Sequence, residues 1–226
     1  MLLRLITLAA YTVLPLVGVL LLGWDWREIM LLYWLENISL GVAVVIRMLR
    51  CANAPGGDDP EPIVEHIVER RVKGRRPRGD GAARSLAGFF ALHYGIFTAV
   101  YGVFVVLLVA GVFEPIPQTQ TPFNWASALI VWVIGGTAQV LAARYGPLPE
   151  RRGPRLMLGA YQRAIVLNVS IVVGTSLITS VDWPAVVAVF LIGLHALVDG
   201  VGWMITAARD RAQLAVLAAR EAAREG

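Results

Sequence analysis

Charge and cysteine are both scarce in this sequence. Only 16% of its 226 residues are Asp, Glu, Lys or Arg, whereas 57% are hydrophobic. A soluble core of this length could not hide so much apolar surface, so the composition excludes an ordinary soluble domain. Cys51 is the only cysteine, which excludes a disulfide within the chain and disfavours a cysteine-based metal cluster.

The signatures of common soluble enzymes are also missing. The sequence contains no phosphate-binding glycine loop, no Gly-x-Ser-x-Gly nucleophile elbow and no His-Glu-x-x-His helix. Any chemistry must therefore come from other residues, and whether the protein is an enzyme stays open at this point.

Six apolar stretches are long enough to cross the ~30 Å hydrocarbon core of a bilayer. They cover residues 3–23, 27–49, 86–112, 124–143, 160–180 and 185–207, and turn or charge signals separate them. We predict an all-α, polytopic transmembrane helical bundle that forms a single membrane domain over residues 1–226. No small-residue cleavage site follows the first stretch, so we expect it to be a retained span rather than a signal peptide.

Basic residues predict the orientation of these spans. If the loop over residues 51–84 is cytoplasmic, then both termini are cytoplasmic too, and only Arg27 and Arg163 among the Lys and Arg residues lie elsewhere. An independent signal agrees, because tryptophans fall at the predicted outer ends of spans, where indole rings prefer to sit. These are Trp24, Trp26, Trp125 and Trp183. We predict a multi-pass protein of the cell inner (cytoplasmic) membrane.

The loops and the tail suggest partners. The basic residues that set the orientation of the spans account for the net charge of +4, so this charge does not call for a nucleic-acid partner. Membrane lipid, with anionic headgroups at the basic cytoplasmic loops, is the expected partner. Residues 60–73 have the spacing of a short interfacial helix, although a solvated basic linker fits about as well. Residues 209–226 predict a cytoplasmic helical tail, which leaves a homo-oligomer contact open.

Ionisable residues inside the spans are the informative ones, because burying them in lipid costs several kcal/mol unless they are paired or solvated. They are Glu36, His93, Arg163, His195 and Asp199. A helical rise of ~1.5 Å per residue places the two acids and the two histidines at similar depths in the cytoplasmic half of the bundle. Arg163 lies nearer the cytoplasmic edge, where it could neutralise either acid.

Local spacing adds polar neighbours to this set. Tyr33 and Asn37 are four residues apart on the second span and flank the glutamate in a polar patch. His195 and Asp199 are also four apart, so the imidazole can donate a proton to the carboxylate. Asn168 on the fifth span falls at a similar depth. On the third span, a seam of small residues predicts close helix packing and turns His93 away from that contact. The seam consists of Gly88, Gly95, Ala99 and Gly102.

Three segments resemble an uncharacterised family of prokaryotic integral membrane proteins. They are a Tyr-Trp-x-Glu-Asn motif at residues 33–37, a Phe-x-x-x-His-Tyr-Gly-x-Phe motif at residues 89–97, and Tyr161-Gln162-Arg163. The resemblance covers most of the chain and implies a domain of unknown function, with no activity attached. It favours Glu36, His93 and Arg163 as site residues.

A second resemblance carries a mechanism. The order of Glu36, His93, His195 and Asp199 is similar to the motif order of the CAAX prenyl protease and bacteriocin-processing family of intramembrane proteases. By this similarity, the glutamate would activate water, His93 would assist it as the second catalytic residue, and the last two residues would stabilise the oxyanion. That family has a paired Glu-Glu and an Arg four residues later, whereas this chain has Asn37 and a glycine at those places.

These residues leave several functions open. Glu36, His93, His195 and Asp199 supply nitrogen and oxygen ligands, so an intramembrane site for a divalent metal such as zinc is the first hypothesis. A glutamate-dependent intramembrane hydrolase and a proton- or ion-coupled transporter are the alternatives. In a structural membrane subunit, the same groups would only satisfy one another.

Overall fold

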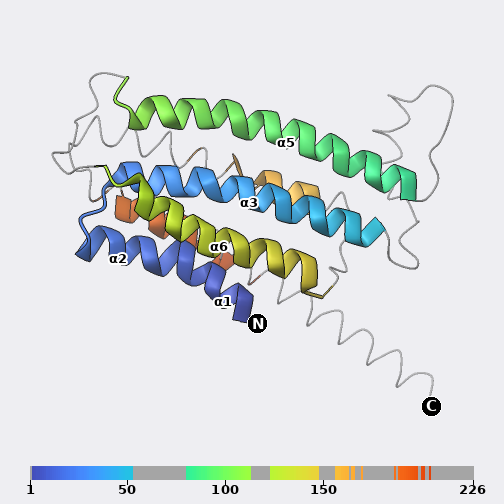
Figure 1. Ribbon diagram of the computed structural model, residues 1–226, viewed down its shortest axis with the longest axis horizontal. Coiled ribbons are helices and arrows are strands. Elements are labelled where there is room, and N and C mark those ends of the chain that lie inside the picture. Colours follow the sequence, from blue (N-terminus) through green and yellow to red (C-terminus); the bar gives the residue numbers. More distant parts are fainter. Residues whose placement is uncertain are drawn as a thin grey trace, which may run out of the picture.

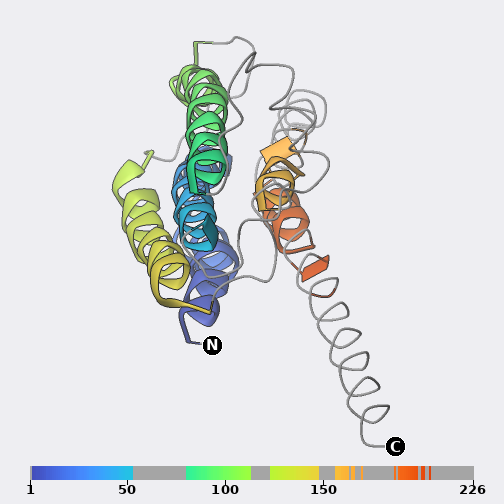
Figure 2. The same ribbon diagram turned by 90° about the vertical axis from the view of Figure 1, so that its right-hand side faces the viewer.

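The protein is seen in a computed structural model that describes residues 2–52, 80–112, 123–147, 156–162, 164–165, 169, 186, 188–197, 200–201 and 204. Every regular element within these residues is a helix, which confirms the all-α prediction for this part of the chain. Figures 1 and 2 show the long helices running side by side.

The first apolar stretch forms a helix with an irregular middle turn. α1 (Leu2–Leu8) and α2 (Leu14–Leu21) are joined by the π-helical turn η1 (Ala9–Val13). Pro15 explains the irregularity, because proline has no backbone N–H to donate to the carbonyl four residues earlier, which is that of Tyr11. That carbonyl instead accepts a hydrogen bond from the Tyr33 hydroxyl at 3.3 Å.

A tight turn then leads into α3 (Trp26–Ala52). Gly23 has a φ of 71°, in the left-handed region that glycine enters without steric cost. Asp25 caps the helix, because its Oδ1 accepts from the N–H of Arg27 at 2.7 Å. Glu28 Oε2 reaches back to accept from the N–H of Asp25 at 3.0 Å. This reciprocal capping box fixes where α3 begins.

α3 packs against two other long helices, α5 (Asp80–Val109) and α6 (Trp125–Tyr145), and lies between them in Figure 1. α5 runs antiparallel to α3, because residues further along one helix meet residues earlier on the other. The indole N–H of Trp34 donates to the carbonyl of Thr98 at 3.0 Å, and the ring of Tyr94 lies against Gly41.

α6 runs parallel to α3 and is bonded to it at both ends. At the starting ends, Glu28 Oε1 accepts from the N–H of Asn124 at 2.8 Å. At the finishing ends, the Arg50 guanidinium donates to the carbonyls of Ala143 at 2.6 Å and Gly146 at 2.9 Å. The second and fourth of a series of consecutive spans must run in the same direction, so this arrangement agrees with the predicted order of spans.

Three of the predicted spans are helices long and apolar enough to cross a membrane. They are Trp26–Cys51, Arg84–Val109 and Trp125–Tyr145. Shorter apolar helices, Leu5–Leu21 and Ala188–Leu197, fall within the predicted first and sixth spans. The interfacial helix predicted over residues 60–73, the tail over 209–226 and most of the predicted fifth span lie outside the described residues.

The packing face of α5 differs from the predicted seam of small residues. Gly88 and Gly95 are exposed, and within the described residues a Cβ added at either would meet nothing within 4 Å. Among the contacts with described residues, Gly102 has the one close approach of the three glycines in the seam, to the indole of Trp34. Within the described residues, the contact of α5 with α3 therefore does not run through Gly88 and Gly95, because large side chains at adjacent positions, such as the buried Tyr94, make it instead.

Tryptophans gather at the end of the bundle where α3 and α6 begin, but they are not alike. Trp125 is 59% exposed, whereas Trp24 and Trp26 are only 8% and 0% exposed. The last two are part of the hydrophobic core and not of a lipid-facing belt. Trp183 lies outside the described residues.

Candidate functional site

A buried carboxylate and a buried imidazole meet beside the middle of α3. Glu36 is 0% exposed, and His195, on the 188–197 helix, is 2% exposed. Glu36 Oε2 and His195 Nε2 are 3.3 Å apart. In a low-dielectric interior, such groups stabilise each other as a carboxylate with an imidazolium, or as a neutral acid with a neutral imidazole. The pair can therefore hold one proton in either of two places.

The other oxygen of Glu36 begins a chain of hydrogen bonds across the bundle. Glu36 Oε1 accepts from the Gln139 amide of α6 at 3.1 Å. Ser39 Oγ donates to Gln139 Oε1 at 2.7 Å and lies 3.4 Å from the Tyr11 hydroxyl. All four side chains are buried. The chain joins η1, α3 and α6, and it orients Glu36 through the oxygen that does not face the imidazole.

Two tyrosine rings hold the imidazole of His195. The Tyr33 ring is stacked on it, with centroids 4.3 Å apart and an interplanar angle of 12°. The Tyr11 ring meets it edge-on, at 6.5 Å and 63°. Because the Tyr33 hydroxyl bonds to the Tyr11 carbonyl, the irregular turn in the first helix positions both rings. The stacked Tyr33 ring and the edge-on Tyr11 ring shield the imidazole from water.

Asn37 links this site to α5. Its Nδ2 donates to the carbonyl of Tyr33 at 3.1 Å, and its Oδ1 accepts from the Tyr94 hydroxyl at 3.4 Å. Gly41 makes room for the Tyr94 ring, since a Cβ there would lie 2.8 Å from it. The α5 side chain next to the site is therefore Tyr94 rather than the adjacent His93.

His93 lies on another face of α5 and is exposed. It stacks on Phe89 with ring centroids 5.6 Å apart and touches the Tyr161 ring edge-on at 5.8 Å. Among the described residues, no hydrogen bond or ion pair joins it to Glu36. Successive helical residues point about 100° apart, so the inward position of Tyr94 turns His93 away. These contacts give no support to a hydrolase in which His93 assists Glu36.

The remaining predicted site residues, Asp199, Arg163 and Asn168, lie outside the described residues. Within the part of the chain that is described, no three His, Cys, Asp or Glu side chains converge as a metal site would require. Of the four predicted metal ligands, Glu36 and His195 are the two that this part of the chain brings together.

An apolar groove of about 400 Å³ opens between α3 and α6 beside this network. Its walls include Ser39, Trp132 and Gly136. Gly136 approaches so closely that a Cβ there would lie 3.1 Å from the Ser39 Cβ. Because Ser39 belongs to the hydrogen-bonded chain that begins at Glu36, the groove directly borders this network.

Sequence reasoning did not single out four side chains with a structural part in these networks: Tyr11, Glu28, Ser39 and Gln139. Gln139 carries a signal that could have found it, because an amide inside an apolar span must find a hydrogen-bond partner. The Asp25-x-x-Glu28 spacing is the signature of a capping box. Tyr11 has no such signal, since its position depends on the π-helical turn.

Comparison with known proteins gives a family and no activity. The family described as "Family of unknown function (DUF6498)" matches residues 2–225. No curated protein and no solved structure matches the chain.

Proposed function

The chain belongs to the DUF6498 family of unknown function, and we propose that it is a proton-coupled membrane transporter whose Glu36 and His195 form the proton-exchange centre. The observation that carries the proposal is the 3.3 Å approach of Glu36 Oε2 to His195 Nε2 between two fully packed side chains. Carboxylates and histidines that face the interior of a membrane bundle commonly serve as proton relays.

The proposal includes six spans in the inner (cytoplasmic) membrane, with both termini and the 51–84 loop in the cytoplasm. It is supported by the alternating directions of α3, α5 and α6. Arg50 and Arg144 lie at the end where α3 and α6 finish, and the exposed Trp125 lies at the opposite end. Under the positive-inside rule, the arginine end faces the cytoplasm.

Proton exchange needs little rearrangement in this geometry. In one state, the Glu36 carboxylate faces a His195 imidazolium. In the other, the proton has moved to Glu36, whose O–H then donates to the neutral Nε2. The Gln139 amide N–H bonds to Glu36 Oε1 in both states, and the stacked Tyr33 ring keeps the imidazole in place. Transport would require the pair to take up a proton from one side of the membrane and release it to the other. A substrate that favours one of these steps would couple its own movement to that of the proton.

Infrared spectroscopy tests the exchange without knowledge of the substrate. Spectra of the protein in lipid bilayers at acid and neutral pH are subtracted, and the carbonyl stretch of a protonated carboxyl group is followed. We expect Glu36→Gln to remove one such band and His195→Gln to shift the pH at which it forms. Glu28→Gln, which changes another buried carboxylate of α3, is the matched control and keeps the band. Identical difference spectra in the wild type and Glu36→Gln would refute the proposal.

Transport itself is tested in proteoliposomes that enclose a pH-sensitive dye, under an imposed potassium diffusion potential. We expect wild-type protein to admit protons faster than protein-free vesicles, and Glu36→Gln to fall to the background rate. Candidate substrates are then added in turn, and each true substrate raises the wild-type rate only. If Glu36→Gln matches the wild type under all these conditions, the proposed transport through Glu36 is refuted.

A divalent metal is the second candidate, and one distance favours it. Two ligands of a tetrahedral zinc ion with bonds of about 2.0–2.1 Å lie roughly 3.3 Å apart. The separation of Glu36 Oε2 and His195 Nε2 is 3.3 Å. Elemental analysis of purified protein separates the candidates. One equivalent of zinc, iron or manganese that Glu36→Gln loses would favour the metal, whereas metal-free folded protein with the infrared band favours proton exchange.

A further inference from the structure

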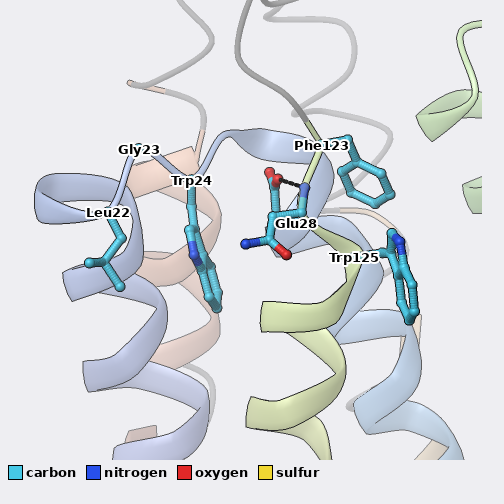
Figure 3. A pocket seen from close by; sticks show the side chains of 7 residues that line it. Leu22, Gly23, Trp24, Glu28, Phe123 and Trp125 are labelled. Carbon is cyan, nitrogen blue, oxygen red and sulfur yellow. Dashed lines mark hydrogen bonds between the residues drawn. The ribbon is translucent and has the colours of Figure 1, made fainter.

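A pocket of about 400 Å³ lies where α3 and α6 begin, and its lining includes none of Glu36, Gln139 and His195. Figure 3 shows the side chains that line it. Aromatic side chains line much of it: Trp24 from the turn after α2, and Phe123 and Trp125 from the start of α6. Figure 3 shows Trp24 and Trp125 on opposite sides of the pocket, with Glu28 between them. The pocket thus combines aromatic walls with a carboxylate.

Glu28 gives this pocket a buried negative charge, since the residue is only 2% exposed. Its two oxygens accept the backbone N–H groups of Asp25 at 3.0 Å and Asn124 at 2.8 Å. The neighbouring Asp25 is paired with Arg27 at 2.6 Å. No side-chain cation bonds to Glu28 within the described part of the chain, and the partial positive charges of the two helix starts face it.

The aromatic walls are suited to a cation. Gly18 packs on one face of the Trp24 ring, where a Cβ would lie 2.5 Å from Cδ2, and this contact fixes the ring beside the pocket. The Arg27 guanidinium already lies over the Phe123 ring, 5.6 Å from its centroid. Ring faces attract cations through the ring quadrupole, most strongly when water is excluded.

We infer that this pocket binds a quaternary ammonium group, such as the trimethylammonium of choline, between Trp24 and Trp125. A quaternary ammonium has no N–H to donate, so it needs negative charge and aromatic faces rather than vacant hydrogen-bond acceptors. Glu28 can supply the charge while keeping both of its backbone hydrogen bonds. The ligand is a soluble choline-like solute or the headgroup of phosphatidylcholine. The inference does not rest on the proposed transport.

Binding is measured by tryptophan fluorescence of the purified full-length protein. The probes are tetramethylammonium, choline and the neutral isostere of choline in which carbon replaces nitrogen. We expect both cations to quench the fluorescence saturably and the isostere to bind roughly tenfold more weakly, as loss of a cation–π contact predicts. Equal binding of choline and its isostere, or no saturable binding of either cation, would overturn the inference.

Two variants separate charge from shape. Glu28→Gln removes the charge, and Trp125→Leu removes an exposed aromatic wall outside the core. Each is expected to weaken choline binding roughly tenfold. Trp132→Leu, on the same helix but outside the pocket, is the control and keeps the wild-type affinity. If Glu28→Gln fails to fold, Trp125→Leu still decides, because wild-type affinity in that variant would overturn the inference.

Nanodiscs of defined composition distinguish the two sources. Free choline is added to protein in phosphatidylglycerol discs and in phosphatidylcholine discs. If choline quenches in phosphatidylglycerol discs but not in phosphatidylcholine discs, the inference is supported and the ligand is a lipid headgroup. If choline quenches equally in both, the inference is supported and the ligand is a soluble solute. Failure of choline to quench in both kinds of disc would overturn it.

Discussion

Glu28 and Glu36 are two buried carboxylates on the same helix, yet they have different kinds of partner. Glu28 accepts backbone N–H groups at the starts of α3 and α6, from Asp25 and Asn124. Glu36 meets the side chains of Gln139 and His195. A backbone N–H keeps its proton throughout the physiological range, whereas an imidazole gains or loses one there.

Burial alone does not distinguish a structural carboxylate from one that can take part in proton exchange. Both residues are within 2% of complete burial. Glu28 fixes the geometry of two helix starts through backbone N–H groups, which have one protonation state. Glu36 belongs to a pair that can redistribute a proton. The identity of the partner, and not the depth of the residue, therefore separates the two roles.

The largest loss of stability is expected at Glu28. Glu28→Ala removes two charge-assisted hydrogen bonds and leaves two N–H groups without their acceptor. At about 1.5–3 kcal/mol for each such bond, the free energy of unfolding should fall by about 3–6 kcal/mol. Equilibrium unfolding in mixed micelles measures it. A loss below about 1 kcal/mol would show that Glu28 does not hold the two helix starts together.

Arg50 tests the opposite ends of the same two helices. Arg50→Met keeps most of the aliphatic stem but removes the donors to the carbonyls of Ala143 and Gly146. Because Arg50 is only partly buried, we expect a smaller loss of about 1–3 kcal/mol in the same unfolding experiment. The exposed Arg144 is the control, and Arg144→Met should change the unfolding free energy by less than about 0.5 kcal/mol.

Glu36→Gln should cost less than either change but alter the response to pH. The new amide can still accept from Gln139 and can donate to a neutral His195, so the loss is about 1–2 kcal/mol. The variant cannot hold the shared proton. It therefore loses whatever pH dependence of the unfolding free energy arises from the Glu36–His195 pair. Stability measured as a function of pH should therefore differ in shape between Glu36→Gln and the wild type. If the two curves of stability against pH remain parallel, Glu36 has no part in proton exchange and is a structural carboxylate.

The smallest effect is expected at Ser39. Ser39→Ala removes the bond to Gln139 Oε1, so the unfolding free energy should fall by about 1 kcal/mol. Gln139 can still donate to Glu36, and the infrared band of the Glu36 carboxyl should persist at a shifted frequency. If the band disappears in Ser39→Ala, the chain of hydrogen bonds is part of the proton-exchange centre and not only its support.

Sequence reasoning singled out two residues that the structure places in contact, and it could not reach their other partners. It identified Glu36 and His195 because ionisable residues are conspicuous in apolar spans. It could not tell that His195, rather than His93, approaches Glu36. A periodic pattern shows which residues share a helix face, but α5 has large apolar residues on several faces, and only packing selected the one that carries Tyr94.

The sequence by itself determined the helical class and the positions of three membrane-length helices. The reason is that a bilayer demands long apolar segments with every backbone group bonded internally. It also contained the capping box that starts α3. Tertiary structure alone decided that the Tyr33 hydroxyl bonds to the Tyr11 carbonyl, which Pro15 leaves free, and that Gln139 and His195 meet opposite oxygens of Glu36. Those contacts join helices far apart in the chain, and local physics does not act over such separations.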